Sequence, residues 1–544
     1  MGNKKEKKPI NLLRGWPSPS LLPVAQLRDA TQRALADPEV YEPGLQYGPD
    51  PGYEPLRQAL AVWLSEFYTF TSSSPSGPST SAPASASAGD GNKMAQYTHP
   101  PDAARIAITG GASQSVAALL QGFTDASEGA TRAVWIAAPC YFLGCRIFSD
   151  AGFAPRDRRL RAVPEDDEGI DVGVLERGMR ELDKEEDGEG RRRRGGGGGV
   201  KDPGPLRKIY RHVVYCVPSF SNPSGKTMSL ARREALVRLA REFDALVICD
   251  DVYDHLHWRV VSNNNPPNNL AFPSTSPSDS PPPRLRTALL PRLIDIDLSL
   301  GRSPHDPAGK GPFGHVVSNG TFSKLSGPGV RTGWTESTAA FAAGVAATGS
   351  SHSGGAPSQL TATFVHQLLT SGDLDHHLVR VLRPAYQRRH VVLLEAVKRL
   401  LVPLGARVAD AGGVPVPGQE EALRVYGGFF VWITFAETTP DDGGKGGGGG
   451  GRKIPEAATI AAHCLTDENL MVGVGHLFEV HGDEAAVRFA RDVRLCFAWE
   501  DEPVLVEGVE RLARVVRRLV DEGEAAWYHP DVDGGGGADV GGMK

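Results

Sequence analysis

The order of apolar runs along the first two-thirds of the chain constrains the fold more than any other feature. Short, almost continuously apolar runs predict five strands, at residues 105–109, 133–139, 212–218, 245–251 and 315–320. Segments with helical spacing lie between them, among them 110–123, 141–152 and 229–243. Parallel strands need such crossover connections and are buried on both faces. The sequence therefore predicts an α/β fold, with a mostly parallel sheet sandwiched by helices.

The pattern changes beyond about residue 375. A long amphipathic helix is predicted at 376–401, then antiparallel strands at 427–435 and 492–499, and a final helix at about 503–523. This order is typical of a smaller α+β domain. We expect an N-terminal arm that joins the small domain, then a large domain, the small domain and a disordered tail, at residues 1–46, 47–374, 375–528 and 529–544.

Glycine and proline are abundant, at 64 and 42 residues, and they cluster in low-complexity insertions. These lie at residues 71–92, 183–204, 261–284, 301–314 and 441–452. Such compositions bury too little apolar surface to offset chain entropy, so we expect surface loops or disorder. The basic run at 191–194 is flanked by acidic residues, which favours a solvated loop over a nuclear signal or an RNA-binding patch.

Charge, cysteine usage and hydropathy exclude several classes of protein. The net charge of −6 offers no basic surface for nucleic acid. The six cysteines show no CxxC pair and no zinc spacing, so no metal site is predicted, and their apolar surroundings suit a reducing compartment. No apolar stretch approaches the roughly 18 residues that a membrane span needs, and no signal-peptide pattern is present. We expect a soluble, cytoplasmic protein that binds neither nucleic acid nor membranes.

Residues 222–227 (NPSGKT) follow a predicted strand and imitate a phosphate-binding P-loop. That loop needs glycine at its first position, where this chain has Phe220. Pro218 and Pro223 also remove backbone N–H groups that would have to face phosphate. A nucleotide hydrolase is therefore disfavoured.

Suggestive side chains follow the carboxyl ends of all five predicted strands, which is where open parallel sheets bind ligands. In chain order these are a glycine turn entering a helix at 110–113, Tyr141, Asn222, Asp250 with Tyr253, and Thr321, Ser323 and Lys324 followed by Arg331. Each is weak alone, but together they suit a phosphorylated pyridine aldehyde. The turn, hydroxyls and arginine can hold phosphate, the aromatic ring can stack, and the carboxylate can keep the ring nitrogen protonated. The lysine can form a Schiff base.

The same residues lie in motifs that resemble the pyridoxal-phosphate (PLP) aminotransferases of fold type I, class I/II. The likeness is greatest to the branch that contains 2-aminoadipate and kynurenine aminotransferases. It is carried by YGPDPGYEPLR (47–57), ITGGASQS (108–115), APCY (138–141), VPSFSNPSGKT (217–227), CDDVY (249–253), GTFSKLSGPGVRTGW (320–334) and VRLCFA (493–498). These motifs span nearly the whole predicted core.

The resemblance implies a role for each matching residue. Lys324 is the catalytic lysine, which carries the cofactor and moves the proton from the substrate Cα. Asp250 pairs with the ring nitrogen, Asn222 and Tyr253 bind the phenolic oxygen, and Tyr141 stacks on the ring. The residues expected to hold the phosphate are Ala112 (through its N–H), Ser113, Thr321, Ser323, Arg331 and, from the neighbouring subunit of a homodimer, Tyr47. Gly15, Asn222 and Arg494 are expected to contact the substrate, with Arg494 on its α-carboxylate.

The implied activity is transfer of an α-amino group from an amino acid to a 2-oxo acid. The best expectation for the substrates is 2-aminoadipate or aromatic donors with 2-oxoglutarate as acceptor, in amino acid biosynthesis. β-Elimination, C–S lyase or cyclopropane-forming chemistry on the same fold stays open as the alternative, because substrate contacts decide the outcome. Arg14 and Arg28 are candidates for binding a second carboxylate, whereas Trp16, Phe429 and Phe430 would suit apolar side chains.

Overall fold

The structure is a computed structural model. It describes residues 7–69, 94, 96–126, 130–154, 159–193, 201–261, 288–355, 357–409, 413–415, 423–440 and 451–530.

An eight-stranded sheet forms the centre of the molecule, with strand order β2-β10-β9-β7-β6-β3-β4-β5. The strands are β2 (Ile106–Thr109), β3 (Ala133–Ala138), β4 (Leu160–Asp166), β5 (Gly169–Ile170), β6 (His212–Cys216), β7 (Ala245–Asp250), β9 (Val316–Thr321) and β10 (Gly333–Glu336). The pairs from β4 through β3, β6 and β7 to β9 are parallel, whereas β10 is antiparallel to both neighbours and β5 is antiparallel to β4. The predicted mostly parallel sheet is confirmed.

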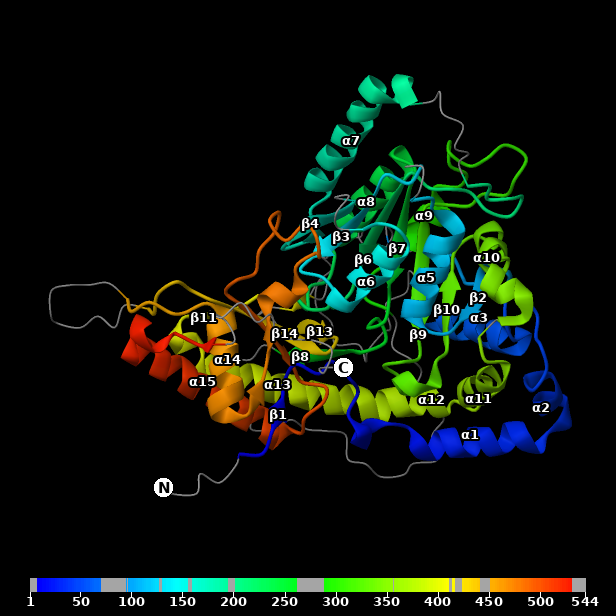
Figure 1. The fold of residues 1–544 in the computed structure, drawn as a ribbon. Helices are drawn as coiled ribbons and strands as arrows, with labels where there is room; N and C mark the ends of the chain where they lie inside the picture. The colour runs from blue at the N-terminus through cyan, green and yellow to red at the C-terminus, as the bar shows by residue number, and fades with distance from the viewer. Residues whose placement is uncertain are drawn as a thin grey trace, which may run out of the picture.

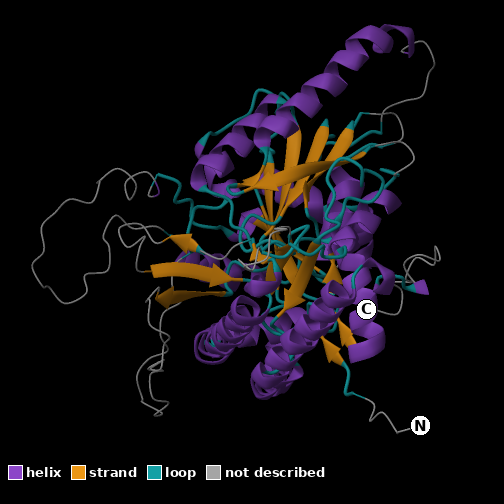
Figure 2. Ribbon diagram, turned by 90° about the vertical axis from the view of Figure 1, so that its left-hand side faces the viewer, coloured by secondary structure: helices purple, strands orange, loops and turns teal. Residues whose placement is uncertain are grey.

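Helices cover both faces of this sheet (Figures 1 and 2). Neighbouring residues of one strand point to opposite faces. On β6, Val213 and Tyr215 pack towards the cluster that contains helices α5 (Ala112–Phe123), α6 (Phe142–Asp150) and α10 (Ala339–Ala346). Val214 and Cys216 pack towards the cluster that contains α7 (Val172–Arg193), α8 (Leu230–Glu242) and α9 (Leu293–Ser299). Burial on both faces is the reason why these strands read as continuous apolar runs.

The C-terminal part contains a second, antiparallel sheet with the order β11-β14-β17-β16. Its strands are β11 (Ala406–Val408), β14 (Phe430–Phe435), β17 (Asp492–Cys496) and β16 (Gly473–Val474). Its helices are α13 (Arg383–Leu400), α14 (Ala457–Glu468) and α15 (Glu502–Glu522), and α12 (Asp373–His377) leads into α13 through a helical turn at Leu378–Leu382. The predicted long helix, the two antiparallel strands and the final helix are therefore present. A small antiparallel sheet joins β8 (His257–Val261), β13 (Leu423–Gly427) and β12 (Val414–Pro415).

The N-terminal arm bridges the two parts of the molecule. Strand β1 (Ile10–Asn11) pairs in parallel with β15 (Leu470–Met471), and the Leu12 carbonyl accepts a hydrogen bond of 2.8 Å from the Cys496 N–H. The chain then continues through α1 (Val24–Ala36), α2 (Pro38–Gly44) and α3 (Glu54–Tyr68), which pack with α11 (Gln359–Thr370) at the base of the large sheet in Figure 1.

The predicted insertions have different outcomes. Helix α7 continues to Arg193, so the first half of the 183–204 insertion is helical, and the prediction of a loop there was wrong. This stretch is rich in Glu, Lys and Arg, which are strong helix formers. Segment 301–314 connects α9 to β9 without a helix or strand. Insertion 71–92 lies outside the described residues, as do 261–284 beyond its first residue, 441–452 up to its last two, and the tail from 531.

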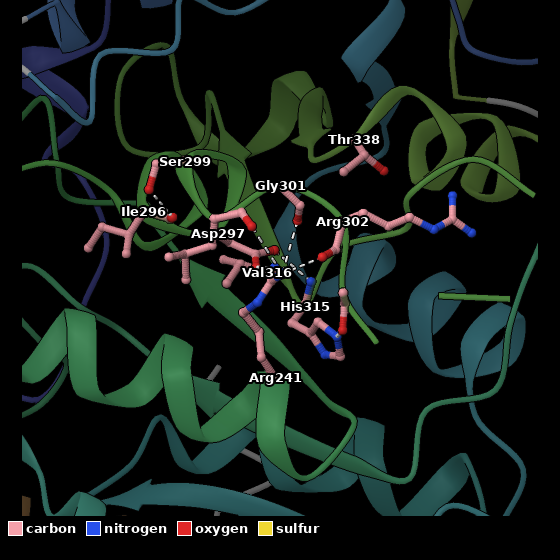
Figure 3. Close-up of polar contacts among 12 residues, drawn as sticks. Arg241, Ile296, Asp297, Ser299, Gly301, Arg302, His315, Val316 and Thr338 are labelled. Carbon is pink, nitrogen blue, oxygen red and sulfur yellow. Dashed lines mark hydrogen bonds and ion pairs between the residues drawn. The ribbon is translucent and has the colours of Figure 1, made fainter. Parts of the chain in front are cut away.

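The segment that begins at 301 is fastened to the core by Arg241 at the end of α8 (Figure 3). One guanidinium nitrogen, Nη1, donates to Asp297 Oδ1 at 2.8 Å, and Nη2 donates to the carbonyls of Gly301 and Arg302 at 3.0 and 2.9 Å. The other Asp297 oxygen accepts from the His315 N–H at 2.6 Å, directly before β9. This network therefore fixes the start of the strand whose far end leads to Lys324.

Among the described helices, none combines the length and apolar character that crossing a membrane requires.

Candidate active site

The predicted site residues meet at one edge of the large sheet because the strand register brings their strand ends together. Thr109 and Thr321, the last residues of β2 and β9, both lie opposite Gly333, the first residue of β10. Asp250, the last residue of β7, lies opposite Asn319 on β9. The glycine turn, the lysine segment and the carboxylate are therefore neighbours in space.

A concave polar cluster forms at the N-terminus of α5. Gly111 has φ +99° at the helix N-cap, and a Cβ there would lie 2.4 Å from Arg331 Nη2. That nitrogen donates to the Gly110 carbonyl at 2.6 Å, and Nη1 lies 3.4 Å from Ser323 Oγ. The hydroxyls of Ser323 and Thr321 are 2.9 Å apart. A helix N-terminus with free N–H groups, hydroxyls and an arginine has the chemistry of a phosphate site.

Asp250 is buried, and only one of its two carboxylate oxygens accepts a hydrogen bond from the described residues. Its Oδ2 accepts a bond of 2.8 Å from the Tyr215 hydroxyl, whereas Oδ1 is buried and has no donor among the described residues. Burial raises the pKa of this carboxyl to about 6, although the bond from Tyr215 and the charge of Lys324 act to lower it. A buried acceptor without a partner is costly, so the protonated ring nitrogen of PLP fits this oxygen.

A small cavity joins this carboxylate to the phosphate cluster. Its lining includes Ala112, Ser113, Tyr141, Tyr215 and Asp250. Tyr141 is half-buried, and its hydroxyl is hydrogen-bonded to the Ser113 side chain. Burial, and secondly the charge of Asp250, raise the pKa of Tyr141. Its position in the lining is compatible with stacking on a ring that is held between the Asp250 carboxylate and the phosphate cluster.

Lys324 projects its amine towards the N-terminal arm. Its Nζ donates to the Gly15 carbonyl at 2.8 Å and lies 5.4 Å from the centre of the Phe429 ring. Burial lowers the pKa of Lys324 to about 8, while Cys496 and Asp250 act to raise it. Relative to an ordinary pKa of 10.5, this increases the neutral, nucleophilic fraction at pH 7 by about 300-fold.

Arg494 is a buried guanidinium without a carboxylate partner among the described residues. Its Nη1 donates to Asn222 Oδ1 at 2.8 Å, its Nη2 donates to the Leu13 carbonyl, and its buried Nε has no acceptor. The rings of Phe430 and Phe478 lie 4.1 and 4.6 Å from it. Burial lowers its pKa to about 10. An uncompensated buried cation favours an anionic ligand, and a carboxylate can bind it in bidentate fashion.

The electrostatics of Tyr253 are influenced by two charged groups, Asp250 and Arg494. Its side chain is buried, with its ring 5.4 Å from that of Phe429 and 6.2 Å from that of Phe430. Burial raises its pKa well above 10, while the charge of Arg494 lowers it and that of Asp250 raises it. Its ring contacts with Phe429 and Phe430 place Tyr253 beside the phenylalanines that also lie near Lys324 and Arg494.

Two predicted residues lie apart. Tyr47 is 87% exposed and packs against Gly354, and the structure describes no contact between it and the other predicted site residues. Arg28 is an exposed surface residue that pairs with Asp29 at 3.1 Å. Arg14, by contrast, directly precedes Gly15 in the wall of the site.

Sequence reasoning missed several groups at the site. Tyr215 could have been found, because its hydroxyl interrupts an otherwise apolar strand that ends at the ligand edge. Phe478 and the Leu13 carbonyl left no comparable signal, because neither an apolar side chain nor a backbone carbonyl marks a binding role in the sequence. Phe429 and Phe430 were considered only as lining, and Phe430 proves to pack on Arg494.

A mostly parallel sheet with a lysine, an aspartate and a phosphate turn at its ligand edge defines a fold type I PLP-dependent enzyme. Residues 91–512 match the family model described as aminotransferase class I and II. The chain belongs to this family.

Individual relatives agree with this assignment. The chain is 31% identical to the uncharacterized protein YER152C of Saccharomyces cerevisiae over 88% of this chain and 90% of that one. It is 23% identical to aromatic-amino-acid aminotransferase 1 of Thermococcus litoralis, over 93% and 88% of the two chains. The solved α-aminoadipate aminotransferase of Thermus thermophilus, complexed with N-(5′-phosphopyridoxyl)-L-leucine, shares the fold with a TM-score of 0.61 at 21% identity, covering 95% of this chain and 94% of that one.

The protein is therefore a PLP-dependent transaminase that acts on an amino acid and a 2-oxo acid. The lyase alternative is not favoured.

Proposed function

We propose that the residues described above divide the work of transamination between a cofactor side and a substrate side. Two buried groups carry this proposal: Asp250 Oδ1, which has no donor among the described residues, and the Arg494 guanidinium, which has no carboxylate partner there. The first suits the ring nitrogen of PLP and the second suits the α-carboxylate of a substrate.

The cofactor side is formed by residues from the large sheet. Asp250 pairs with the protonated ring nitrogen, Tyr141 stacks on the ring, and Asn222 and Tyr253 bind its phenolic oxygen. The phosphate is held by the Ala112 N–H, Ser113, Thr321, Ser323 and Arg331. When bound, PLP supplies an electron sink for the negative charge that develops at the substrate Cα.

The substrate side positions the reacting atoms around Lys324. Arg494 and Asn222 hold the α-carboxylate, and Gly15 keeps the arm close because it has no side chain. With its pKa lowered to about 8, Lys324 can release and accept a proton readily, and it would serve as the base and acid that takes the proton from the substrate Cα and returns it.

We propose aromatic amino acids or 2-aminoadipate as donors and 2-oxoglutarate as acceptor, in amino acid biosynthesis. The names of the Thermococcus and Thermus relatives support these donors. The phenylalanines around Arg494 and Lys324 can accept an apolar side chain.

We further propose a cytoplasmic homodimer with the division into arm, large domain and small domain at residues 1–46, 47–374 and 375–528. Tyr47 is exposed, as expected of a residue that reaches the phosphate of a second subunit. All six cysteines are buried free thiols, which suits a reducing compartment.

The test is the visible absorption spectrum of the purified protein, followed by addition of single amino acids. We expect a cofactor band that donors bleach with release of their 2-oxo acids. Lys324→Ala should lose the wild-type band and lower the rate by about 10⁴-fold or more. Lys453→Ala, at an exposed surface ion pair, is the matched control and should behave as wild type. Release of ammonia and pyruvate would contradict transamination, and a protein that cannot be loaded with PLP would contradict the cofactor site.

A further inference from the structure

We propose that Arg14 binds the distal carboxylate of dicarboxylic substrates, so that the N-terminal arm selects acidic 2-oxo acids and amino acids. This inference rests on the proposed function, because it assigns the second carboxylate contact of the same site.

Arg14 lies in the wall of the site between two residues whose carbonyls face the reacting groups. The Leu13 carbonyl accepts from Arg494, and the Gly15 carbonyl accepts from Lys324 Nζ. Consecutive Cα atoms are about 3.8 Å apart, so the Arg14 backbone is adjacent to both contacts. Its side chain therefore starts beside the space where a substrate would lie.

Two indole rings hold the Arg14 head. Its guanidinium carbon lies 4.9 Å from the centre of the Trp16 ring and 4.8 Å from that of Trp499, and the two rings are 6.1 Å apart and nearly perpendicular. Aromatic faces attract a guanidinium and keep its plane oriented without neutralising its charge. The head is thus positioned before any ligand binds.

In the part of the chain that the structure describes, no carboxylate balances the charge of Arg14. No carboxylate in the described part of the chain lies within ion-pair distance of its head, and its buried Nε has no acceptor. Its hydrogen bond to the rest of the arm is made by the backbone N–H, which donates to Asn11 Oδ1 at 2.9 Å. The neighbouring acid, Glu500, accepts instead from the Asn11 backbone N–H at 3.0 Å. By contrast, Arg28 and Arg33 of the same arm pair with Asp29 and Asp373.

The position suits an extended diacid. Arg494 takes the α-carboxylate, and the substrate side chain then has to pass the arm, where Gly15 is so close to Phe430 that a Cβ would lie 2.8 Å from its Cζ. The carboxyl carbons of a five- or six-carbon diacid are about 5 to 6 Å apart. A planar guanidinium with free donors binds such a carboxylate in a paired geometry. A substrate with one carboxylate leaves this arginine unused.

The first test compares acceptors in the PLP-loaded enzyme with one fixed donor. In Arg14→Gln we expect kcat/KM for 2-oxoglutarate to fall about 10- to 100-fold, while the value for pyruvate stays within about twofold. Arg28→Gln is the matched control and should change neither value. An unchanged value for 2-oxoglutarate, or an equal fall for both acceptors, would overturn the inference. A selective loss with phenylpyruvate would instead show that the indoles bind an aromatic side chain.

A second test needs no variant. Glutarate and valerate have the same carbon number but two and one carboxylates, and we expect glutarate to inhibit the wild-type enzyme at least about tenfold more strongly. Equal inhibition contradicts the role of Arg14 even if Arg14→Gln fails to fold. Failure of the wild type to transfer an amino group to any acceptor would contradict the proposed function itself, whereas transfer without a diacid preference would contradict only this inference.

Discussion

The cofactor side of the site and its substrate side differ in how their parts are joined along the chain. The cofactor side consists of strand ends and their following turns, at 110–113, 250 and 321–331, which the sheet register aligns. The substrate side joins Leu13 to Gly15 of the arm with Asn222 and Arg494, and its contacts include backbone carbonyls. The sheet can therefore maintain cofactor binding while the arm and the C-terminal part vary in substrate preference.

Among substitutions on the cofactor side, we expect Asp250→Ala to cause the largest loss of activity. It should lower kcat/KM by about 10³-fold, because the ring nitrogen loses its only buried carboxylate partner. Steady-state kinetics at saturating cofactor measure this, with Asp167→Ala at a fully exposed acid as the control. Activity within tenfold of wild type would show that Asp250 does not pair with the ring.

Arg494→Gln should separate the two sides. We expect KM for amino donors to rise by about 10²-fold, because a charged, paired contact to the α-carboxylate is lost. The absorption band of the bound cofactor should stay unchanged. If the variant instead loses its cofactor, then the two sides are not independent.

Gly15→Ala tests the close approach of the arm. A Cβ at Gly15 would collide with Phe430 Cζ at 2.8 Å, so the arm has to move away from Lys324 and kcat/KM should fall about tenfold. Phe430→Leu in the same chain removes the colliding atom and should restore part of the activity. Equal loss in the single and double variants would mean that the distance between arm and lysine is unimportant.

Tyr215→Phe should have the smallest effect, a shift in pH dependence. The wild-type Asp250 has a pKa of about 6, so cofactor affinity should fall as the pH drops below 6 and the carboxyl is protonated. The Tyr215 bond lowers this pKa, and its loss should move the onset to higher pH. Titration of cofactor binding between pH 5 and 8 measures the shift.

The same pKa has a consequence for the cofactor-free protein. Folding raises the pKa of the Asp250 carboxyl from 3.8 to about 6. The stability that protonated Asp250 contributes to the folded protein is therefore fully present below pH 3.8 and is lost as the pH rises through 6. The stabilisation by PLP in thermal unfolding should therefore be larger at pH 7 than at pH 5. Asp250→Asn should abolish that difference.

Much of the large sheet was predictable because burial on both faces leaves apolar runs at the parallel strands β3, β6, β7 and β9. Strand β4 (LRAVPED) was not predicted, although it pairs in parallel with β3, because a proline and charged residues interrupt its apolar pattern. Strand β10 (GWTE) was not predicted, since four residues ending in an acid carry no such pattern, although Glu336 is buried against Arg105 and Arg292. The helical stretch up to Arg193 was missed because its charge-rich composition resembles a disordered linker.

The site was predictable to different extents on its two sides. Motif residues such as Asp250, Lys324 and Arg331 follow strands, so topology alone brings them together. Arg494 was predicted by resemblance, but its environment depends on Leu13 and Phe478, which are remote in sequence and make contacts that no local pattern encodes. Arg14 could be named from the sequence only by position, and its unpaired charge between two indoles became visible only in three dimensions.

The pairing of β1 with β15 also bears on how the protein is made. Ile10 and Leu12 form main-chain bonds with residues 469–471 and 496, so the segment around β1 lacks these strand partners until most of the chain has been synthesised. At about 5 to 20 residues per second, that interval lasts roughly half a minute to a minute and a half. The large sheet can form on the ribosome during this time, but the lysine pocket cannot close until translation is nearly finished.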